Sequence, residues 1–100
     1  MTKIPTMVRL DPDAVLRCPQ CTEAYLHHRA VDIFARSEDA QNGMHVHVEG
    51  DDVSLNGDLA GNPSPRRQGL LLRFACELCE AETSLAIVQD KGMTIMLWQT

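Results

Sequence analysis

Two C-x-x-C pairs constrain this chain more than any other feature of its sequence. They are Cys18-Pro19-Gln20-Cys21 and Cys76-Glu77-Leu78-Cys79, and they contain every cysteine of the 100 residues. Four thiolates are enough to close a tetrahedral zinc site, and structural zinc sites fill all four positions with protein ligands. The sequence therefore predicts one metal site formed by all four cysteines. Zinc is the expected metal, and iron is an alternative on the same sulfurs.

The separation of the two pairs limits how the chain can fold around a shared ion. Fifty-four residues lie between Cys21 and Cys76, whereas paired C-x-x-C motifs are commonly about 15–20 residues apart. The intervening segment must therefore be a β insertion whose two ends return to the same place. Zinc knuckles often have glycine soon after the second cysteine, but Thr22 and Glu80 stand there. Disulfides or a redox couple remain open as an alternative use of the thiols.

Composition favours a fold stabilised by a metal ion, and the lack of an export signal favours the cytoplasm. Only four residues are aromatic, which is a small supply of large side chains for the core of a 100-residue domain. The first residues lack the apolar run of a signal peptide, and no segment approaches the roughly 20 apolar residues of a membrane helix. We therefore expect a cytoplasmic protein, and in that compartment paired cysteines bind metal more often than they form disulfides.

Alternation of apolar and polar residues predicts a mainly β fold. Residues 44–49 alternate almost without fault, and Val31, Ile33 and Ala35 share one face of a second such segment. Polar, glycine-rich or proline-rich turns separate the alternating segments. The expected strands cover residues 30–36, 44–49, 53–55, 70–75, 83–89 and 93–98.

These strands are expected to form one domain over residues 1–100, a small antiparallel β-sheet with a zinc-ribbon-like four-cysteine clasp. Residues 1–17 form an N-terminal arm, residues 18–79 are bounded by the two cysteine knuckles, and residues 83–98 form a C-terminal hairpin. No window of eleven or more residues has a helical stripe, so only a short helical turn beside the first knuckle is foreseen. The last strand, 93–98, is also a candidate sheet edge for pairing with another chain.

The balance of charge argues against a general nucleic-acid binder. Fourteen acidic residues against nine basic ones give a net charge of −5, and zinc bound by four thiolates would make it more negative. Phosphate binding depends on Lys and Arg, and only Arg66 and Arg67, with Arg73, form a local basic cluster. These three arginines are the candidate partner-binding residues, for a phosphate or an acidic partner. Solvated loop charges are the alternative.

A catalytic zinc site is a remote alternative. The string His47-Val48-Glu49, followed by Cys76-Glu77-Leu78-Cys79, superficially matches the H-x-E…P-C-x-x-C signature of zinc deaminases. Ala75 stands where that signature has proline, and the histidine and glutamate lie in a segment of strand period instead of on a helix. The first cysteine pair would also have no role. An enzyme is therefore not expected.

The four histidines occur as His27-His28 and as His45-x-His47. The second pair shares one face of its expected strand and could bind another metal at this spacing. The alternative is that both are solvent-facing polar positions of an amphipathic strand. Neither pair has an evident nucleophile or an oriented carboxylate partner, so a catalytic triad is not supported.

Several strings distributed over residues 18–92 resemble a group of small bacterial proteins with paired C-x-x-C motifs, which are associated with prophages, plasmids and other mobile elements. The strings are Cys18-Pro19-x-Cys21, Tyr25-Leu26-His27-His28, Phe34-Ala35-Arg36, Glu38-Asp39-Ala40, Gly61-Asn62-Pro63-Ser64 with Arg66-Arg67, Cys76-Glu77-x-Cys79 and Gln89-Asp90-Lys91-Gly92. The resemblance implies zinc-ribbon-like ligation and a bacterial or phage cytoplasmic setting. It brings no activity with it.

Together these patterns predict a small non-enzymatic zinc-binding adaptor or protein-interaction module. A protein partner is expected through the Arg66–Arg67 loop or the last strand. Two binding alternatives stay open: a nucleic-acid-binding zinc ribbon that uses the same loop, and an acidic inhibitor that mimics nucleic acid. The deaminase-like enzyme is the third alternative.

Overall fold

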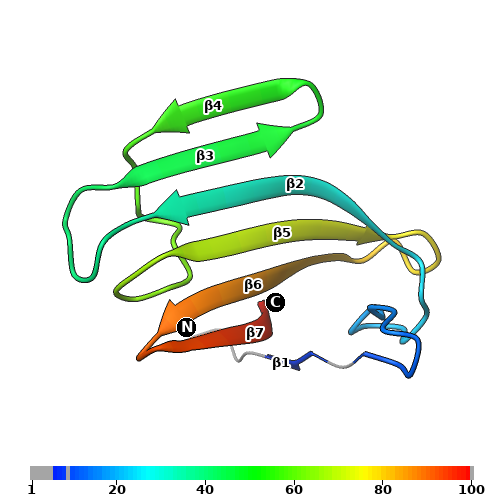
Figure 1. The fold of residues 1–100 in the computed structure, drawn as a ribbon. Coiled ribbons are helices and arrows are strands. Elements are labelled where there is room, and N and C mark those ends of the chain that lie inside the picture. The colour runs from blue at the N-terminus through cyan, green and yellow to red at the C-terminus, as the bar shows by residue number, and fades with distance from the viewer. Residues whose placement is uncertain (1–5, 9, 100) are drawn as a thin grey trace.

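The chain folds into one seven-stranded antiparallel sheet in the computed structural model, which describes residues 6–8 and 10–99 (Figure 1). The strands are β1 (Thr6–Met7), β2 (Leu26–Ala35), β3 (Met44–Glu49), β4 (Asp52–Asn56), β5 (Gly69–Cys76), β6 (Glu82–Asp90) and β7 (Met93–Gln99). Across the sheet their order is β1-β7-β6-β5-β2-β3-β4. This arrangement confirms the predicted mainly β, antiparallel fold class. Among the described residues, no helix has the length and apolar character needed to cross a membrane.

β2 is longer than its sequence pattern predicts, because a bulge interrupts the alternation of apolar and polar residues near its start. The strand begins at Leu26, and its register with β5 shifts between His28 and Ala30. A bulge inserts one unpaired residue, so the two-residue alternation breaks at that point. The segment after the first knuckle therefore forms a strand, where the sequence had allowed a helical turn.

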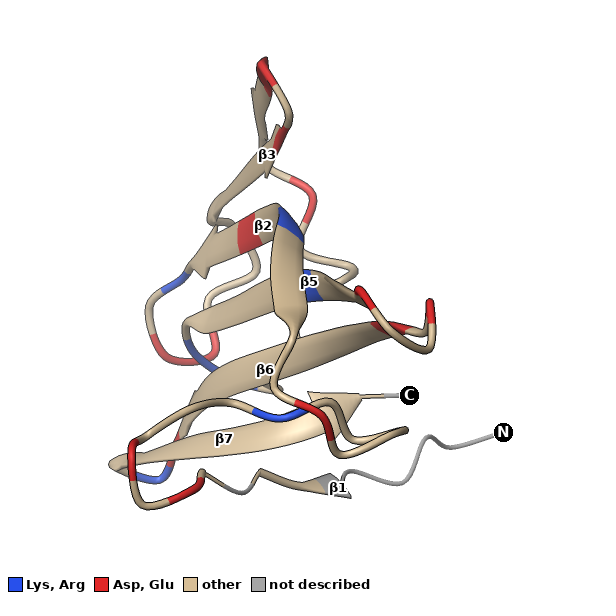
Figure 2. Ribbon diagram, turned by 90° about the vertical axis from the view of Figure 1, so that its right-hand side faces the viewer, with Lys and Arg blue, Asp and Glu red and all other residues tan. Residues whose placement is uncertain are grey.

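Both faces of the sheet carry buried residues on β6. Ala86 and Val88 are buried on one face of β6, and Leu85 is buried on the other. On the Leu85 face, Trp98 is 2% exposed and its ring meets Phe74 edge-on at a centroid distance of 6.0 Å. The strands rotate progressively from β7 to β3 (Figure 2), as the twist of antiparallel sheets requires.

The long irregular segment between β4 and β5 packs against the sheet. Ser64 is buried, and its hydroxyl donates to the carbonyl of Gln89 at 2.8 Å. The side chain of Asn62 donates to the carbonyl of Arg67 at 2.9 Å. A Cβ at Gly69 would collide with Asn62 and Pro63, so only glycine lets this loop approach β5 so closely.

The far edge of the sheet is exposed. All five residues of β4 are exposed, including Val53 (68%) and Leu55 (65%). The last strand, β7, was a candidate edge, but Met7 and Thr6 of β1 pair with its residues Leu97 and Trp98. Within the described part of the chain, β7 is therefore the second strand from one edge, and β4 is the long unpaired strand at the other edge.

Candidate metal centre

Pairing between β2 and β5 brings the two cysteine knuckles together. The first knuckle lies shortly before β2, and the second begins at the last residue of β5. Leu26, the first residue of β2, is the cross-strand partner of Cys76. The amide of Glu77 also donates to the carbonyl of Tyr25 at 3.0 Å. The 54-residue separation therefore closes because the two ends of the insertion are neighbours in the sheet (Figure 1).

The four Sγ atoms form a compact cluster, all within 4.8 Å of one another. Cys18 Sγ lies 3.7 Å from Cys79 Sγ, and Cys21 Sγ lies 3.6 Å from Cys76 Sγ. Sulfurs bound tetrahedrally to zinc at about 2.3 Å lie about 3.8 Å apart, so the spacing suits such an ion. The structure thus brings together all four predicted ligands in a plausible metal-binding site.

The two knuckles have the same backbone hydrogen bonds. The amide of each first cysteine donates to the carbonyl five residues later, from Cys18 to Glu23 and from Cys76 to Ala81, both at 2.9 Å. Their carbonyls accept from the amides of Thr22 (2.9 Å) and Glu80 (3.1 Å). Thr22 and Glu80 have φ angles of 67° and 62°, in the left-handed region that favours glycine. The missing knuckle glycines are therefore replaced by residues held in the same conformation.

The sulfurs differ in how readily they lose a proton. Backbone amides of Cys79 and Leu78, opposed by burial, lower the pKa of Cys76 to about 7. The amide of Glu23 favours the thiolate of Cys21, but burial and contact with the other three sulfurs raise its pKa to about 12. Four thiolates this close repel one another, and a divalent cation among them removes that repulsion. The cluster can therefore be fully ionised only around a metal ion.

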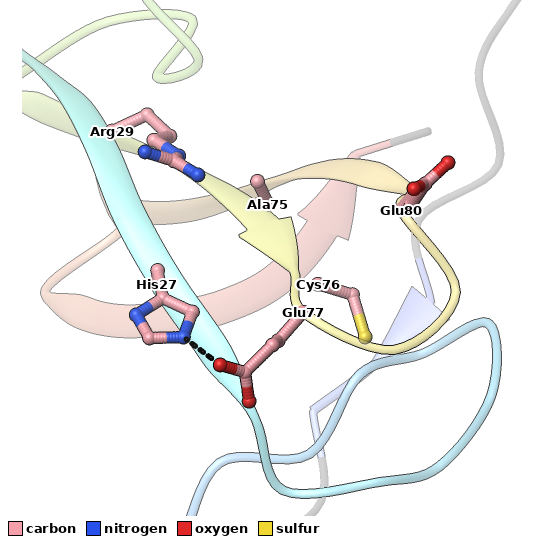
Figure 3. Close-up of a pocket in the computed structure, with 6 residues that line it drawn as sticks. All are labelled: His27, Arg29, Ala75, Cys76, Glu77 and Glu80. Atoms are coloured by element: carbon pink, nitrogen blue, oxygen red, sulfur yellow. Dashed lines mark ion pairs between the residues drawn. The ribbon is translucent and has the colours of Figure 1, made fainter.

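A pocket of about 430 Å³ lies beside the second knuckle (Figure 3). Its lining residues are His27, Arg29, Ala75, Cys76, Glu77 and Glu80. In Figure 3 the Cys76 sulfur points toward the N-terminal loop, where Cys21 lies 3.6 Å away. His27 Nε2 is 3.7 Å from Glu77 Oε1, and both side chains are more than half exposed. An exposed ion pair of this kind contributes little to stability.

The three candidate partner-binding arginines lie close to acidic side chains. Arg66 contacts Asp39 through two nitrogens, at 2.9 and 2.6 Å, and this pairing holds the pKa of Asp39 below its ordinary range. Arg67 Nη2 donates to Glu38 at 2.8 Å. Arg73 projects from β5, and its Nη1 lies 3.9 Å from Glu49. The first two arginines therefore fasten their loop to the turn before β3, and the third lies apart from them.

The deaminase-like set does not assemble. His47 pairs across the sheet with Asp32, which in turn pairs with Leu71. Leu71 precedes Cys76 by five residues on β5, a separation of about 17 Å along the strand. The sulfurs of Cys76 and Cys79 cluster with those of Cys18 and Cys21, and His47 belongs to a different group of potential ligands.

Asp32 is the residue that sequence reasoning missed. Together with His45 and His47 it forms a second group whose ligand atoms lie within 4.8 Å of one another. The sequence marked the two histidines as a candidate pair but gave no role to Asp32. The signal that was lacking is the register of β2 against β3, which places Asp32 directly opposite His47.

Comparison with models of protein families, with curated proteins and with solved structures gives no match for this chain.

Proposed function

We propose that this protein is a small, non-enzymatic zinc-binding module that recognises another protein. The proposal rests on one observation: the cysteine cluster and the exposed apolar face lie in different parts of the sheet. A closed cysteine cluster lies beside the end of β5, and an exposed apolar face covers β2, β3 and β4. The first is suited to holding the chain together and the second to contacting a partner. The bacterial or mobile-element setting and the cytoplasmic location belong to the same proposal.

Zinc is the metal that best suits the cysteine cluster. Four cysteine sulfurs in one compact cluster match the ligand set of structural zinc sites, in which no position remains for substrate. Binding energies of about 10–16 kcal/mol are typical of such sites. They are comparable with the whole stability of a small domain, about 5–15 kcal/mol. The ion would therefore decide whether the N-terminal segment and the sheet stay together.

The exposed apolar face supplies the contact surface. It consists of Ile33 (40% exposed), Met44 (51%), Val53 (68%) and Leu55 (65%), and cross-strand register places all four on one side of the sheet. Contiguous exposed apolar residues on three neighbouring strands are typical of interaction sites. The unpaired backbone of β4 beside them can accept a further strand.

Charge suggests the chemistry of the partner. The end of the β3–β4 hairpin carries three exposed acidic residues, Glu49 at the end of β3, Asp51 in the turn and Asp52 at the start of β4. Cross-strand register places Glu49 and Asp52 on the side of the sheet opposite Val53 and Leu55. We therefore propose an extended segment of another protein, apolar where it pairs with β4 and basic where it passes this turn. The ion-paired arginines Arg66 and Arg67 lie outside this surface.

A capture experiment tests the proposal. The zinc-loaded chain, the V53T/L55T double variant and the control variant M93T are immobilised and exposed to extract of the source organism. Met93 is also exposed (54%) but belongs to β7, on the other side of the sheet's centre. A protein held by the native chain and by M93T, but not by V53T/L55T, supports the proposal. Equal capture by all three would contradict it.

A gel-shift titration separates this function from nucleic-acid binding. The proposal expects no complex with DNA or RNA at physiological salt, since Arg66 and Arg67 already neutralise Asp39 and Glu38. A complex whose affinity falls steeply with salt, and which is lost in R66Q/R67Q, would establish the nucleic-acid-binding alternative instead.

A further inference from the structure

Three potential metal ligands meet on the side of the sheet opposite the exposed apolar face. His45 Nε2 and His47 Nδ1 each lie 2.7 Å from the same atom, Oδ1 of Asp32. All three side chains are largely buried, with 18%, 28% and 15% of their surfaces exposed. Two imidazoles directed at a single carboxylate oxygen form a preassembled set of two nitrogens and one oxygen.

The strands hold this set in place. Asp32 of β2 lies directly opposite His47 of β3, and His45 is its diagonal neighbour, two residues along. Residues in these relations have side chains on the same face and within reach of one another. The ring of His45 stacks on Phe34 with centroids 4.3 Å apart and planes 11° apart. Phe34 is itself buried, so one ring is fixed by packing before any ligand arrives.

We propose that Asp32, His45 and His47 bind a divalent transition-metal ion of the zinc class, distinct from the ion of the cysteine cluster. Imidazole nitrogen and carboxylate oxygen are the donors that zinc, nickel and iron accept. Ligand atoms of a tetrahedral ion bound at about 2.0–2.1 Å lie about 3.4 Å apart. Each ring needs to withdraw from Asp32 by less than about 1 Å to admit the ion.

Glu49 supports this assignment through the outer nitrogen of His47. Its Oε1 lies 3.0 Å from His47 Nε2, on the side of the ring away from Asp32. A neutral imidazole carries one ring proton, so only a protonated His47 can donate to Asp32 and Glu49 together. A metal ion on Nδ1 would satisfy both nitrogens of the neutral ring, because Nε2–H then donates to Glu49. A carboxylate behind a ligating histidine is the usual arrangement around protein-bound zinc.

The two metal sites would differ in their affinity for the ion and in the number of coordination positions left free. His45 Nδ1 is buried without a hydrogen-bond partner among the described residues, so this ligand lacks the second support that His47 has. Three protein ligands also leave a fourth position for water or a partner's side chain, whereas the cysteine cluster is closed. We therefore expect the ion at Asp32 to bind after, and more weakly than, the ion at the cysteines.

Metal titration of the untagged, reduced, metal-free chain tests the proposal. Zinc calorimetry should show two binding phases with a total of two ions per chain. With cobalt, thiolate-to-metal charge transfer should saturate at the first ion, and the second should add only weak visible bands. The variants D32N, H45Q and H47Q should weaken the second phase at least tenfold. The control variant H28Q, which removes an exposed histidine from β2, should retain both phases.

The outcomes separate this site from the cysteine site. A native chain that binds a single ion, with charge transfer and no second phase, would overturn the proposal. A second phase that survives both H45Q and H47Q, or that H28Q weakens equally, would also overturn it. Since His47 is the most exposed of the three side chains, H47Q keeps the test decisive if D32N does not fold. Failure of the first phase alone would count against the cysteine cluster and not against this site.

Discussion

The cysteine cluster and the Asp32–His45–His47 cluster are built in opposite ways. The cysteines lie on two turns that are far apart in sequence, and these turns meet only because β2 and β5 are neighbours. The Asp–His cluster lies on two adjacent strands that follow one another in the chain, where the register alone places its ligands. The first therefore ties the chain's N-terminal segment to the sheet, whereas the second adds no connection that the sheet lacks.

From this difference we expect the cysteine cluster to stabilise the fold and the Asp32–His45–His47 cluster to bind a ligand. Metal loss at the cysteines should release the N-terminal segment, because Cys18 and Cys21 have no strand pairing of their own. Metal loss at Asp32 leaves a paired strand and a hydrogen-bonded side-chain network. A closed four-sulfur shell suits stability, and a three-ligand shell with an open position suits binding. The predictions below test this division.

The largest effect should come from breaking the cysteine cluster. In C76S we expect loss of at least about 5 kcal/mol, enough to unfold the domain, because the site contributes energy of the same order as the total stability. Circular dichroism and the dispersion of amide NMR signals measure the outcome. A strong chelator should unfold the native chain and D32N alike, and added zinc should refold both. A C76S variant that melts like the native chain would show that the clusters do not differ in this way.

A smaller loss of folding free energy should follow from disrupting the Asp32–His45–His47 cluster when no metal ion is bound there. Asp32 accepts hydrogen bonds from two histidines, so D32N should cost about 1.5–3 kcal/mol of folding free energy, the range for bonds to a charged group. Urea unfolding of the zinc-loaded chain, with one ion per chain, measures this cost. H28Q is the matched control and should lie within about 0.5 kcal/mol of the native chain. A D32N variant that unfolds completely would make this cluster structural as well.

The second cluster should also make stability depend on pH. Hydrogen bonds to Asp32 and Glu49 raise the pKa of His47 above 6.5. Burial would raise the pKa of Asp32, but hydrogen bonds from His45 and His47 outweigh it and hold that pKa below 3.8. The His47 contribution is complete below pH 6.5 and is lost as pH rises through the raised pKa. The Asp32 contribution is present above pH 3.8 and is lost as pH falls through the lowered pKa.

Stability from this cluster should therefore be greatest between about pH 4 and pH 6.5 and should decline above that range. Urea midpoints measured from pH 5 to pH 9 in the native chain and in H47Q isolate the contribution of His47. The difference between the two proteins should shrink as pH rises. A difference that grows with pH, or stays constant, would contradict the assigned hydrogen bonds.

The smallest change in stability should come from the residue of the second knuckle whose φ angle lies in the left-handed region. Glu80 has a φ of 62° and an exposed side chain, so E80G should stabilise the domain by about 0.5–1 kcal/mol. The conformational relief exceeds the entropy that glycine adds to the unfolded chain. E80A keeps the strained Cβ and should be close to neutral. Chemical unfolding of the zinc-loaded proteins measures both, and a destabilised E80G would show that the knuckle does not need this conformation.

Sequence patterns predicted much of the fold and the cysteine cluster. Alternation over residues 44–49 corresponds to β3, and β6 and β7 cover the two predicted C-terminal strands. The first residues of β2 were not predicted, because the bulge between His28 and Ala30 interrupts the alternation. Arg66 and Arg67 were predicted as part of a local basic cluster, but the acidic residues that pair with them, 27 and 29 residues away in the chain, were not identified. Local patterns cannot reveal such contacts.

The amino-acid sequence by itself determined the chemistry of the candidate metal site, because its two C-x-x-C pairs supply four thiolates. It also determined that the chain forms strands, because the period of its apolar residues is a local property. Only the tertiary structure decided that Asp32 meets His45 and His47, and that Val53 and Leu55 lie exposed at a sheet edge. Register and strand order are set by contacts between distant segments, so they become visible only when the chain is folded.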